Sequence, residues 1–184
     1  SFTGGVRVAA ADVDGDGFAD IITAAGPGGG PHVEVFSGLT GQLIRSFFAY
    51  SAAFTGGVYV AAGDVNGDGH PDIVTGPGEG GGPHLRVFDG TSNGGLLEET
   101  MAFKPGTAGS GGQITSTTVW TNGLRVATTD FNQDGAADII VGPGRGQPPL
   151  LRILDGKTLT GLLSPDPTTV FDPGFLGGIF VAGS

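Results

Sequence analysis

The chain has 184 residues and a formal net charge of −10 at pH 7, with 38 glycines, 12 prolines and no cysteine. This length allows one domain with a sizeable hydrophobic core, and the lack of cysteine excludes disulfide bonds and thiol chemistry. The acidic balance without a basic cluster argues against nucleic acid as a partner, and no apolar run approaches the roughly 18 residues expected of a membrane-inserted helix.

Short apolar stretches follow one another along the chain, separated by glycine and proline clusters. At the beginning, this pattern predicts strands at Val6–Ala11, Ile21–Ala24, Val33–Phe36 and Leu43–Tyr50. No segment shows a sustained helical period, so the expected fold class is all-β.

The pattern is repeated. "FTGGVRVAAADVDGDGFADII" starts at Phe2, "FTGGVYVAAGDVNGDGHPDIV" at Phe54, "NGLRVATTDFNQDGAADII" at Asn122 and "FLGGIFVAGS" at Phe175. We therefore predict one repeat region over 1–184, with repeats at about 2–53, 54–121 and 122–174, an insert near 104–123 and a partial repeat over 175–184.

Four antiparallel strands in about 50 residues match one blade of a β-propeller. The alanine-rich first strand of each repeat is expected to be innermost, because only small side chains fit where blades converge. Three blades and the first strand of a fourth make a partial propeller, which a longer chain or self-association would complete, since rings have about 4–8 blades. A β-solenoid is the alternative, less favoured because its repeats are usually shorter.

Each complete repeat contains an aspartate-rich loop of nine residues: "DVDGDGFAD", "DVNGDGHPD" or "DFNQDGAAD". Ca²⁺ takes 6–8 oxygen ligands, and side chains at loop positions 1, 3, 5 and 9 with the carbonyl at position 7 would supply them around a glycine at position 6. The expected ligands of three calcium ions are Asp12, Asp14, Asp16, Phe18, Asp20, Asp64, Asn66, Asp68, His70, Asp72, Asp130, Asn132, Asp134, Ala136 and Asp138.

Two alternatives to calcium apply to these loops. Asp, Asn and Gly favour turns without any metal, and this alternative is strongest in the third loop, where Gln133 replaces the usual glycine. Magnesium is less suited than calcium to a site made only of protein ligands. The loops are not EF-hands, because position 12 is Thr23, Thr75 or Val141 instead of glutamate.

The motif D-x-[DN]-x-D-G-x-x-D between two strands, followed by a Gly-Pro turn, resembles the FG-GAP/VCBS repeat family. That family includes the propeller of integrin α subunits and many bacterial extracellular proteins. "Phe-Gly" appears here as Phe54-Thr-Gly-Gly, which places the chain nearer the bacterial variety. The resemblance implies calcium loops between strands one and two, an extracellular or cell-surface location, and a role in adhesion or ligand recognition.

Two other motifs have simpler interpretations. "GPGEGG" at 76–81 matches a dinucleotide-binding pattern, but a strand and not a helix is predicted to follow it. His32 and His84 occupy one repeat position, which favours packing near a turn over a second metal site because Leu150 occupies it in the third repeat.

Positions that differ between repeats indicate a candidate ligand surface. The second residue of the inner strand is Arg7, Tyr59, Arg125 or Phe180, and the insert near 104–123 contains the only tryptophan, Trp120. Long loops and tryptophan are common in binding sites, although the insert could equally be a hairpin that packs on its blade.

Together with the resemblance to the FG-GAP/VCBS repeat family, the sequence predicts a calcium-stabilised, non-catalytic module for extracellular recognition or adhesion, with a protein or carbohydrate partner. A propeller-type hydrolase or lyase domain and a structural spacer of a large surface protein are the alternatives. An enzyme is less favoured because there is no cysteine nucleophile and the clustered carboxylates are assigned to cations.

Overall fold

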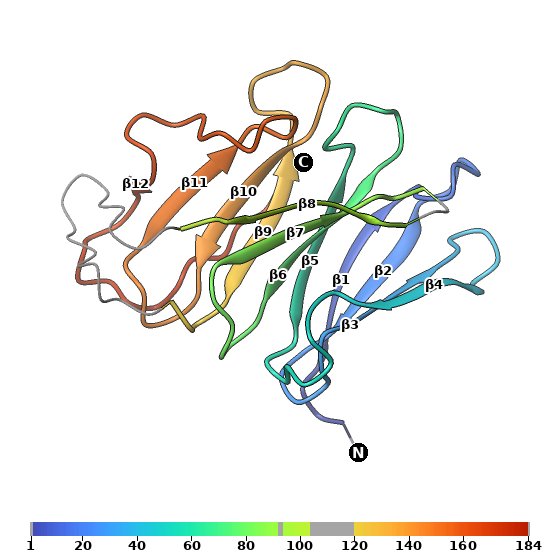
Figure 1. Cartoon of the computed structure of the whole chain (residues 1–184), viewed down its shortest axis with the longest axis horizontal. Helices are drawn as coiled ribbons and strands as arrows, with labels where there is room; N and C mark the ends of the chain where they lie inside the picture. Colours follow the sequence, from blue (N-terminus) through green and yellow to red (C-terminus); the bar gives the residue numbers. More distant parts are fainter. Residues whose placement is uncertain (1, 92–93, 104–119, 184) are drawn as a thin grey trace.

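The computed structural model describes residues 2–91, 94–103 and 120–183, which form an all-β structure (Figure 1). In this part of the chain no helix has the length and apolar character needed to cross a membrane. The strands are β1 (Val6–Ala11), β2 (Asp20–Ala25), β3 (His32–Phe36), β4 (Leu43–Phe48), β5 (Val58–Gly63), β6 (Asp72–Pro77), β7 (His84–Phe88), β8 (Leu96–Met101), β9 (Leu124–Thr129), β10 (Asp138–Pro143), β11 (Leu150–Leu154) and β12 (Thr168–Thr169).

The strands form three antiparallel sheets of four strands, each in sequence order: β1 to β4, β5 to β8, and β9 to β12. The first two strands pair in the same register in every sheet. Ala11 lies opposite Asp20, Gly63 opposite Asp72, and Thr129 opposite Asp138. The all-β class and the four-stranded blades are thereby confirmed, with β4 ending at Phe48, before the predicted Tyr50.

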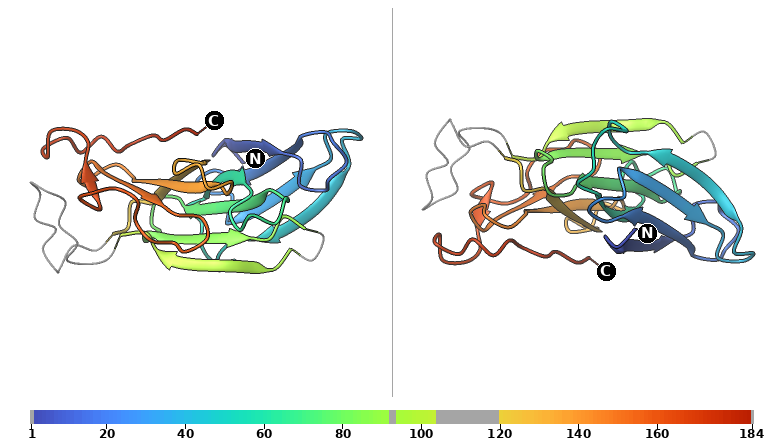
Figure 2. Two further views of the ribbon diagram at one scale, coloured as in Figure 1. Left: turned by 90° about the horizontal axis from the view of Figure 1, so that it is seen from above. Right: turned by 90° about the horizontal axis from the view of Figure 1, so that it is seen from below.

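The alanine-rich strands β1, β5 and β9 lie at the inner edges of the three sheets, which fan outward from them (Figure 2). Space between neighbouring inner strands is narrow. A side chain at Gly63 would come within 2.8 Å of the Ala137 Cβ and 3.1 Å of the Thr128 Cβ. The small residues at these positions therefore allow the blades to converge, as the sequence predicts.

Equivalent backbone hydrogen bonds link each blade to the next segment of the chain. The N–H of Gly28 donates to the carbonyl of Thr55 at 2.7 Å, and that of Gly80 donates to Thr121 at 2.6 Å. The third bond of this kind runs from Gly146 N–H to the carbonyl of Leu176, also at 2.7 Å. The segment that begins near Leu176 therefore occupies the place of a fourth inner strand.

Two hydrophobic cores fill the space between the sheets, where each fully buried aliphatic side chain contributes about 1.5–3 kcal/mol. The core between the first two blades includes Ile22, Val33, Val35, Val58 and Ile73. The core between the second and third blades includes Val74, Leu85, Phe103, Trp120, Leu124, Ile139 and Leu150.

The two ends of the blade series differ. Residues 175–183 run beside β9 and bury Ile179, but they form no strand. At the other end, β1 leaves Val6 and Val8 61% and 66% exposed. The three sheets thus form an open part of a propeller, as predicted. The segment at 175–183 lies where the first strand of a fourth blade was expected, although it is not itself a strand.

Candidate functional site

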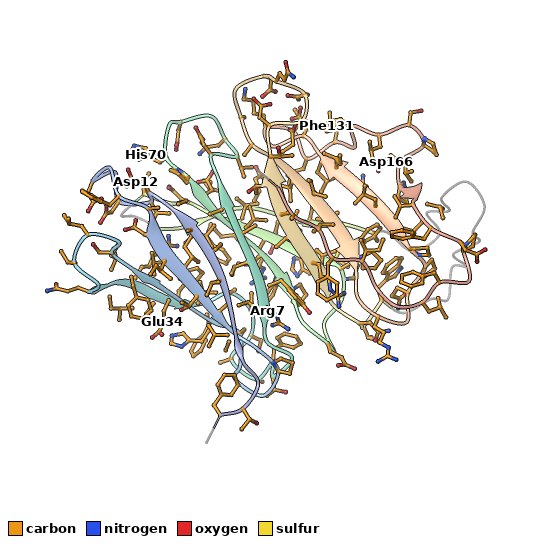
Figure 3. All side chains as sticks on the ribbon, turned by 180° about the vertical axis from the view of Figure 1, so that it is seen from behind. Arg7, Asp12, Glu34, His70, Phe131 and Asp166 are labelled. Atoms are coloured by element: carbon orange, nitrogen blue, oxygen red, sulfur yellow. The ribbon has the colours of Figure 1, made fainter. Side chains whose placement is uncertain are left out.

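The three aspartate loops join the first and second strands of their blades and lie along one edge of the molecule. Asp12, His70 and Phe131 mark the three loops on this edge, whereas Arg7 lies toward the opposite end of the inner strands (Figure 3). The regular antiparallel register places the loops there, because each loop closes the same end of a strand pair.

The first aspartate of each loop curls the backbone around its own carboxylate. Asp12 accepts hydrogen bonds from the N–H groups of Gly15 at 2.9 Å, Asp16 at 3.0 Å and Gly17 at 2.8 Å. Asp64 accepts the same three bonds in the second loop, from Gly67, Asp68 and Gly69. In the third loop Asp130 accepts bonds from Asp134 and Gly135.

The glycine at position 6 of each loop has a left-handed backbone conformation, with φ of 89° at Gly17 and Gly69 and 85° at Gly135. A residue without Cβ adopts this conformation at little cost, which explains its place in the motif. The residue at position 7 comes next in the chain. There the N–H groups of Phe18, His70 and Ala136 donate hydrogen bonds to the position-5 aspartates of their loops.

The loops differ electrostatically at positions 3 and 5. In the first loop, partial desolvation, with repulsion from Asp20, Asp16 and Asp12, raises the pKa of Asp14 above its usual value. In the second, the hydrogen bond from the Asn66 amide lowers the pKa of Asp68. In the third, the Ala136 N–H makes the largest contribution to a lowered pKa of Asp134, with Asn132 and Lys157 adding to it. Like charge therefore contributes to the raised pKa of Asp14 in the first loop, whereas amide and N–H donors lower the pKa of Asp68 and Asp134 in the other two.

The last aspartate of each loop has a second role that the sequence interpretation missed. Asp20, Asp72 and Asp138 are 0% exposed. In each, Oδ2 accepts bonds from the N–H groups at loop positions 2 and 3, and Oδ1 accepts one from a glycine 18 residues later. Burial raises the pKa of Asp72 to about 6, despite these bonds.

The glycines that complete these bonds are a signal that could have been found in the sequence. Gly38, Gly90 and Gly156 stand at the same repeat position, after the third strand of each blade. A Cβ at these glycines would lie only 1.8–2.3 Å from the carbonyl oxygen of Ala19, Pro71 or Ala137, respectively, which is far too close. Only glycine permits the turn to approach the buried aspartate.

The first loop fits a divalent cation. Asp12, Asp14 and Asp20 each offer a carboxylate oxygen, and these atoms all lie within 4.8 Å of one another. Oxygens at 2.3–2.6 Å from one calcium ion are at most about 5 Å apart, so this spacing suits calcium. In the other loops Asn66 and Asn132 replace the third-position carboxylate, and Lys157 Nζ lies 3.4 Å from Asp134 Oδ1 in the third.

The candidate ligand residues of the inner strands meet at the other end of the blades. The Arg7 guanidinium carbon lies 3.7 Å from the centre of the Tyr59 ring. That of Arg125 lies 5.3 Å from the same ring and 4.5 Å from the Phe180 ring. These four residues therefore form one continuous group, although they come from four different repeats.

Trp120 does not belong to this group, so the prediction that it lies on a ligand surface is wrong. Its side chain is 6% exposed and stacks on Phe103 with ring centres 4.8 Å apart and planes 4° from parallel. Apolar packing in the core between blades explains this place. Residues 104–119 of the insert lie outside the described residues.

The two histidines are separate and make different contacts. His32 Nε2 lies 2.7 Å from Ser46 Oγ, and His84 Nε2 lies 3.3 Å from Glu99 Oε2. The "GPGEGG" segment connects β6 to β7, so a strand follows it as predicted.

Comparison with known proteins agrees with the fold and the loops. The family model described as an FG-GAP-like repeat matches residues 12–75 and 64–141, and the chain belongs to this family. No curated protein matches the chain.

Solved structures with a similar fold include two rhamnogalacturonan lyases. Rhamnogalacturonan lyase YesW has a TM-score of 0.52 and 15% identity, covering 86% of this chain. Exotype rhamnogalacturonan lyase YesX has a TM-score of 0.52 and 16% identity, covering 85%. The chain spans only 30% and 29% of the length of these two proteins. At this identity the likeness shows the fold alone.

Proposed function

We propose that the protein is a calcium-stabilised propeller module for extracellular recognition or adhesion, without catalytic activity of its own. The observation that carries the proposal is the hydrogen-bonding pattern shared by the three aspartate loops, with converging carboxylates in the first. Such loops concentrate ten of the 18 acidic residues, and bound cations would neutralise them. Three divalent ions would reduce the net charge from −10 to −4.

Calcium has a structural role in this proposal. It occupies the loop between the first two strands of each blade and neutralises carboxylates that otherwise repel one another. The extracellular location rests on the family and on the expectation that such sites need the millimolar calcium found outside cells. A dissociation constant far below about 1 µM would remove that support.

A calorimetric calcium titration of chelator-treated protein tests the proposal directly. We expect three sites, with the first loop the tightest, and a clear rise of the melting temperature when calcium is added. An Asp12→Ala variant is the matched control, since it should lose one site only. An unchanged heat signal and an unchanged melting temperature would mean that the aspartates serve as turn residues alone.

A polysaccharide lyase domain is the second candidate, and the similar fold of the two rhamnogalacturonan lyases favours it. A lyase creates a carbon–carbon double bond in its product, which absorbs ultraviolet light. Incubation of the protein and calcium with rhamnogalacturonan therefore separates the candidates. We expect no increase in absorbance; an increase that scales with protein concentration would replace the recognition proposal with a catalytic one.

A further inference from the structure

A cavity of about 240 Å³ lies at the end of the inner strands, beside the contact of Arg7 with Tyr59. Arg7, Tyr59 and Arg125 line it from β1, β5 and β9. Pro27, Glu79 and Arg145 line it from the turns between the second and third strands, and Asn122 completes the wall. Three successive blades thus contribute to one cavity.

The wall of this cavity consists only of positions that vary between repeats. Arg7, Tyr59 and Arg125 share one repeat position, at offsets of 52 and 66 residues. The same offsets relate Pro27 to Glu79 and Arg145. Asn122 stands at another shared repeat position, where the first two repeats have the glycines Gly4 and Gly56. Scaffold positions such as the first, fifth and ninth loop residues are aspartate in all three repeats, so the repeats have diverged where the cavity lies.

The charge of the cavity opposes that of the whole chain. Three of the eight basic residues line it, against one acidic residue, in a protein with a net charge of −10. Within the described residues, none of these arginines is in an ion pair with a carboxylate. Arg86, Arg152 and Lys157, by contrast, are all paired with acidic side chains. The cavity therefore has a net positive charge.

Contacts with backbone and rings hold two of these arginines in place. Arg7 Nη1 donates to the carbonyl of Val58 at 3.1 Å, and Arg125 Nη1 donates to that of Pro143 at 3.1 Å. The Tyr59 and Phe180 rings support the guanidinium groups by cation–π contact. Arg125 Nε is buried without a hydrogen-bond partner in the described structure. Only Nη1 of each group is used in these bonds, so Nη2 of Arg7 and of Arg125 remains a donor that a ligand could use.

We propose that this cavity binds an oxyanion group, a carboxylate or a phosphate, of the ligand that the module recognises. Planar guanidinium groups bind both oxyanions through paired N–H donors, and fixed donors lose less entropy on binding than mobile ones. The volume is below the roughly 300–1,000 Å³ of sites that enclose a whole small molecule. The cavity therefore takes one charged group, and the rest of the ligand lies outside it. This inference rests on the proposed recognition function and adds the chemistry of its ligand.

The test is a titration of the full, calcium-loaded chain with glucuronate, inorganic phosphate and glucose at constant ionic strength, followed by calorimetry. We expect saturable binding of one equivalent of glucuronate or phosphate and none of glucose. Tighter binding of glucuronate would identify a carboxylate ligand, and tighter binding of phosphate a phosphorylated one. The absence of saturable binding for both anions would overturn the proposal.

Two variants of the cavity should act in opposite directions. Arg145 is exposed and makes no side-chain hydrogen bond in the described structure, so Arg145→Gln should preserve the fold and weaken anion binding at least about tenfold. Glu79→Gln should strengthen binding, because it removes the one negative charge in the wall. Lys157→Gln makes the same charge change at the loop edge and should leave anion binding unchanged. If Arg145→Gln and Lys157→Gln weakened anion binding equally, the net charge of the protein would explain the weakening, and the proposal would be overturned.

Calcium titration of the same variants separates this inference from the proposed function. Arg145→Gln and Glu79→Gln should bind calcium as the parent chain does, because the cavity and the loops lie at opposite ends of the inner strands (Figure 3). Calcium binding without anion binding would refute the cavity alone. Anion binding without calcium binding would refute the calcium-stabilised module and leave the cavity assignment intact.

Discussion

The N–H of Gly90 donates a hydrogen bond of 3.2 Å to Oδ1 of Asp72, which links the turn after β7 to the aspartate loop before β6. Because the other oxygen of Asp72 accepts from Val65 and Asn66, one buried carboxylate fixes both the loop and the outer half of its blade. The same links occur in the other two blades. The aspartate loops are therefore parts of the blade framework, in addition to their proposed role as metal ligands.

Asp72→Ala should destabilise the protein by about 3 kcal/mol or more, because it leaves buried N–H donors without an acceptor. The loss should appear in chelator as well as in calcium, when unfolding is measured by chemical denaturation. Asp68→Ala is the matched control: this residue is exposed, so its loss should lower stability mainly when calcium is present. Equal behaviour of the two variants in chelator would contradict the framework role.

The raised pKa of Asp72 predicts a pH dependence of the calcium-free protein. Its pKa is about 6 in the folded state and 3.8 as the ordinary value, so the folded state binds more protons between these limits. Lowering the pH from 7 toward 4 should therefore reduce the destabilising effect of this buried charge. Calcium favours the ionised carboxylate and should reverse the trend.

Melting temperatures between pH 4 and 7, with chelator and with calcium, check this prediction. Asp72→Asn provides the control, because it cannot ionise and should lose this contribution in chelator. If, in chelator, the melting temperature of the unsubstituted protein depended on pH in the same way as that of Asp72→Asn, the predicted contribution of Asp72 would be contradicted.

The repeat made much of the architecture predictable. The offset of 52 residues and the Gly-Pro turns were enough to predict where the strands of the first two blades lie, because equivalent residues form equivalent strands in each blade. Trp120 was misplaced because its exposure depends on Phe103, which no periodic signal connects with it. The link from Asp72 to Gly90 was missed because a motif read in isolation does not show which turn approaches it.

The cavity was only partly predictable for a similar reason. Variation at Arg7, Tyr59 and Arg125 could be read from the repeats, since these residues share a position on the inner strand. The contribution of Glu79 and Arg145 required the structure, because it depends on how a turn of one blade lies beside the next inner strand.

Gln133 provides a test of backbone strain in the third loop. Its φ is 60°, in the left-handed region where the equivalent Gly15 and Gly67 have φ of 76°. Gln133→Gly should stabilise the protein by about 0.5–1 kcal/mol, the difference between the relieved strain and the added entropy of the unfolded chain. The reverse change Gly15→Gln should destabilise the protein by a similar amount through the same backbone strain. No steric clash adds to this cost, because a Cβ at Gly15 would meet only His70, at an ordinary contact distance of 3.9 Å. Chemical denaturation in calcium would measure both, and a loss of stability in Gln133→Gly would contradict the strain argument.

Lys157 should weaken calcium binding in the third loop. Its Nζ lies 3.4 Å from Asp134 Oδ1 and 3.3 Å from the Asp134 carbonyl, so its charge opposes that of an incoming cation. Lys157→Gln should raise calcium affinity at this loop roughly three- to tenfold at low salt, and the gain should shrink as salt screens the exposed charges. Chemical shifts of the Gly135 amide during a calcium titration would report this site, while Gly17 and Gly69 report the other two as internal controls. If all three glycines shifted to the same extent, or Gly135 not at all, the proximity of Lys157 would have no specific effect on the third loop.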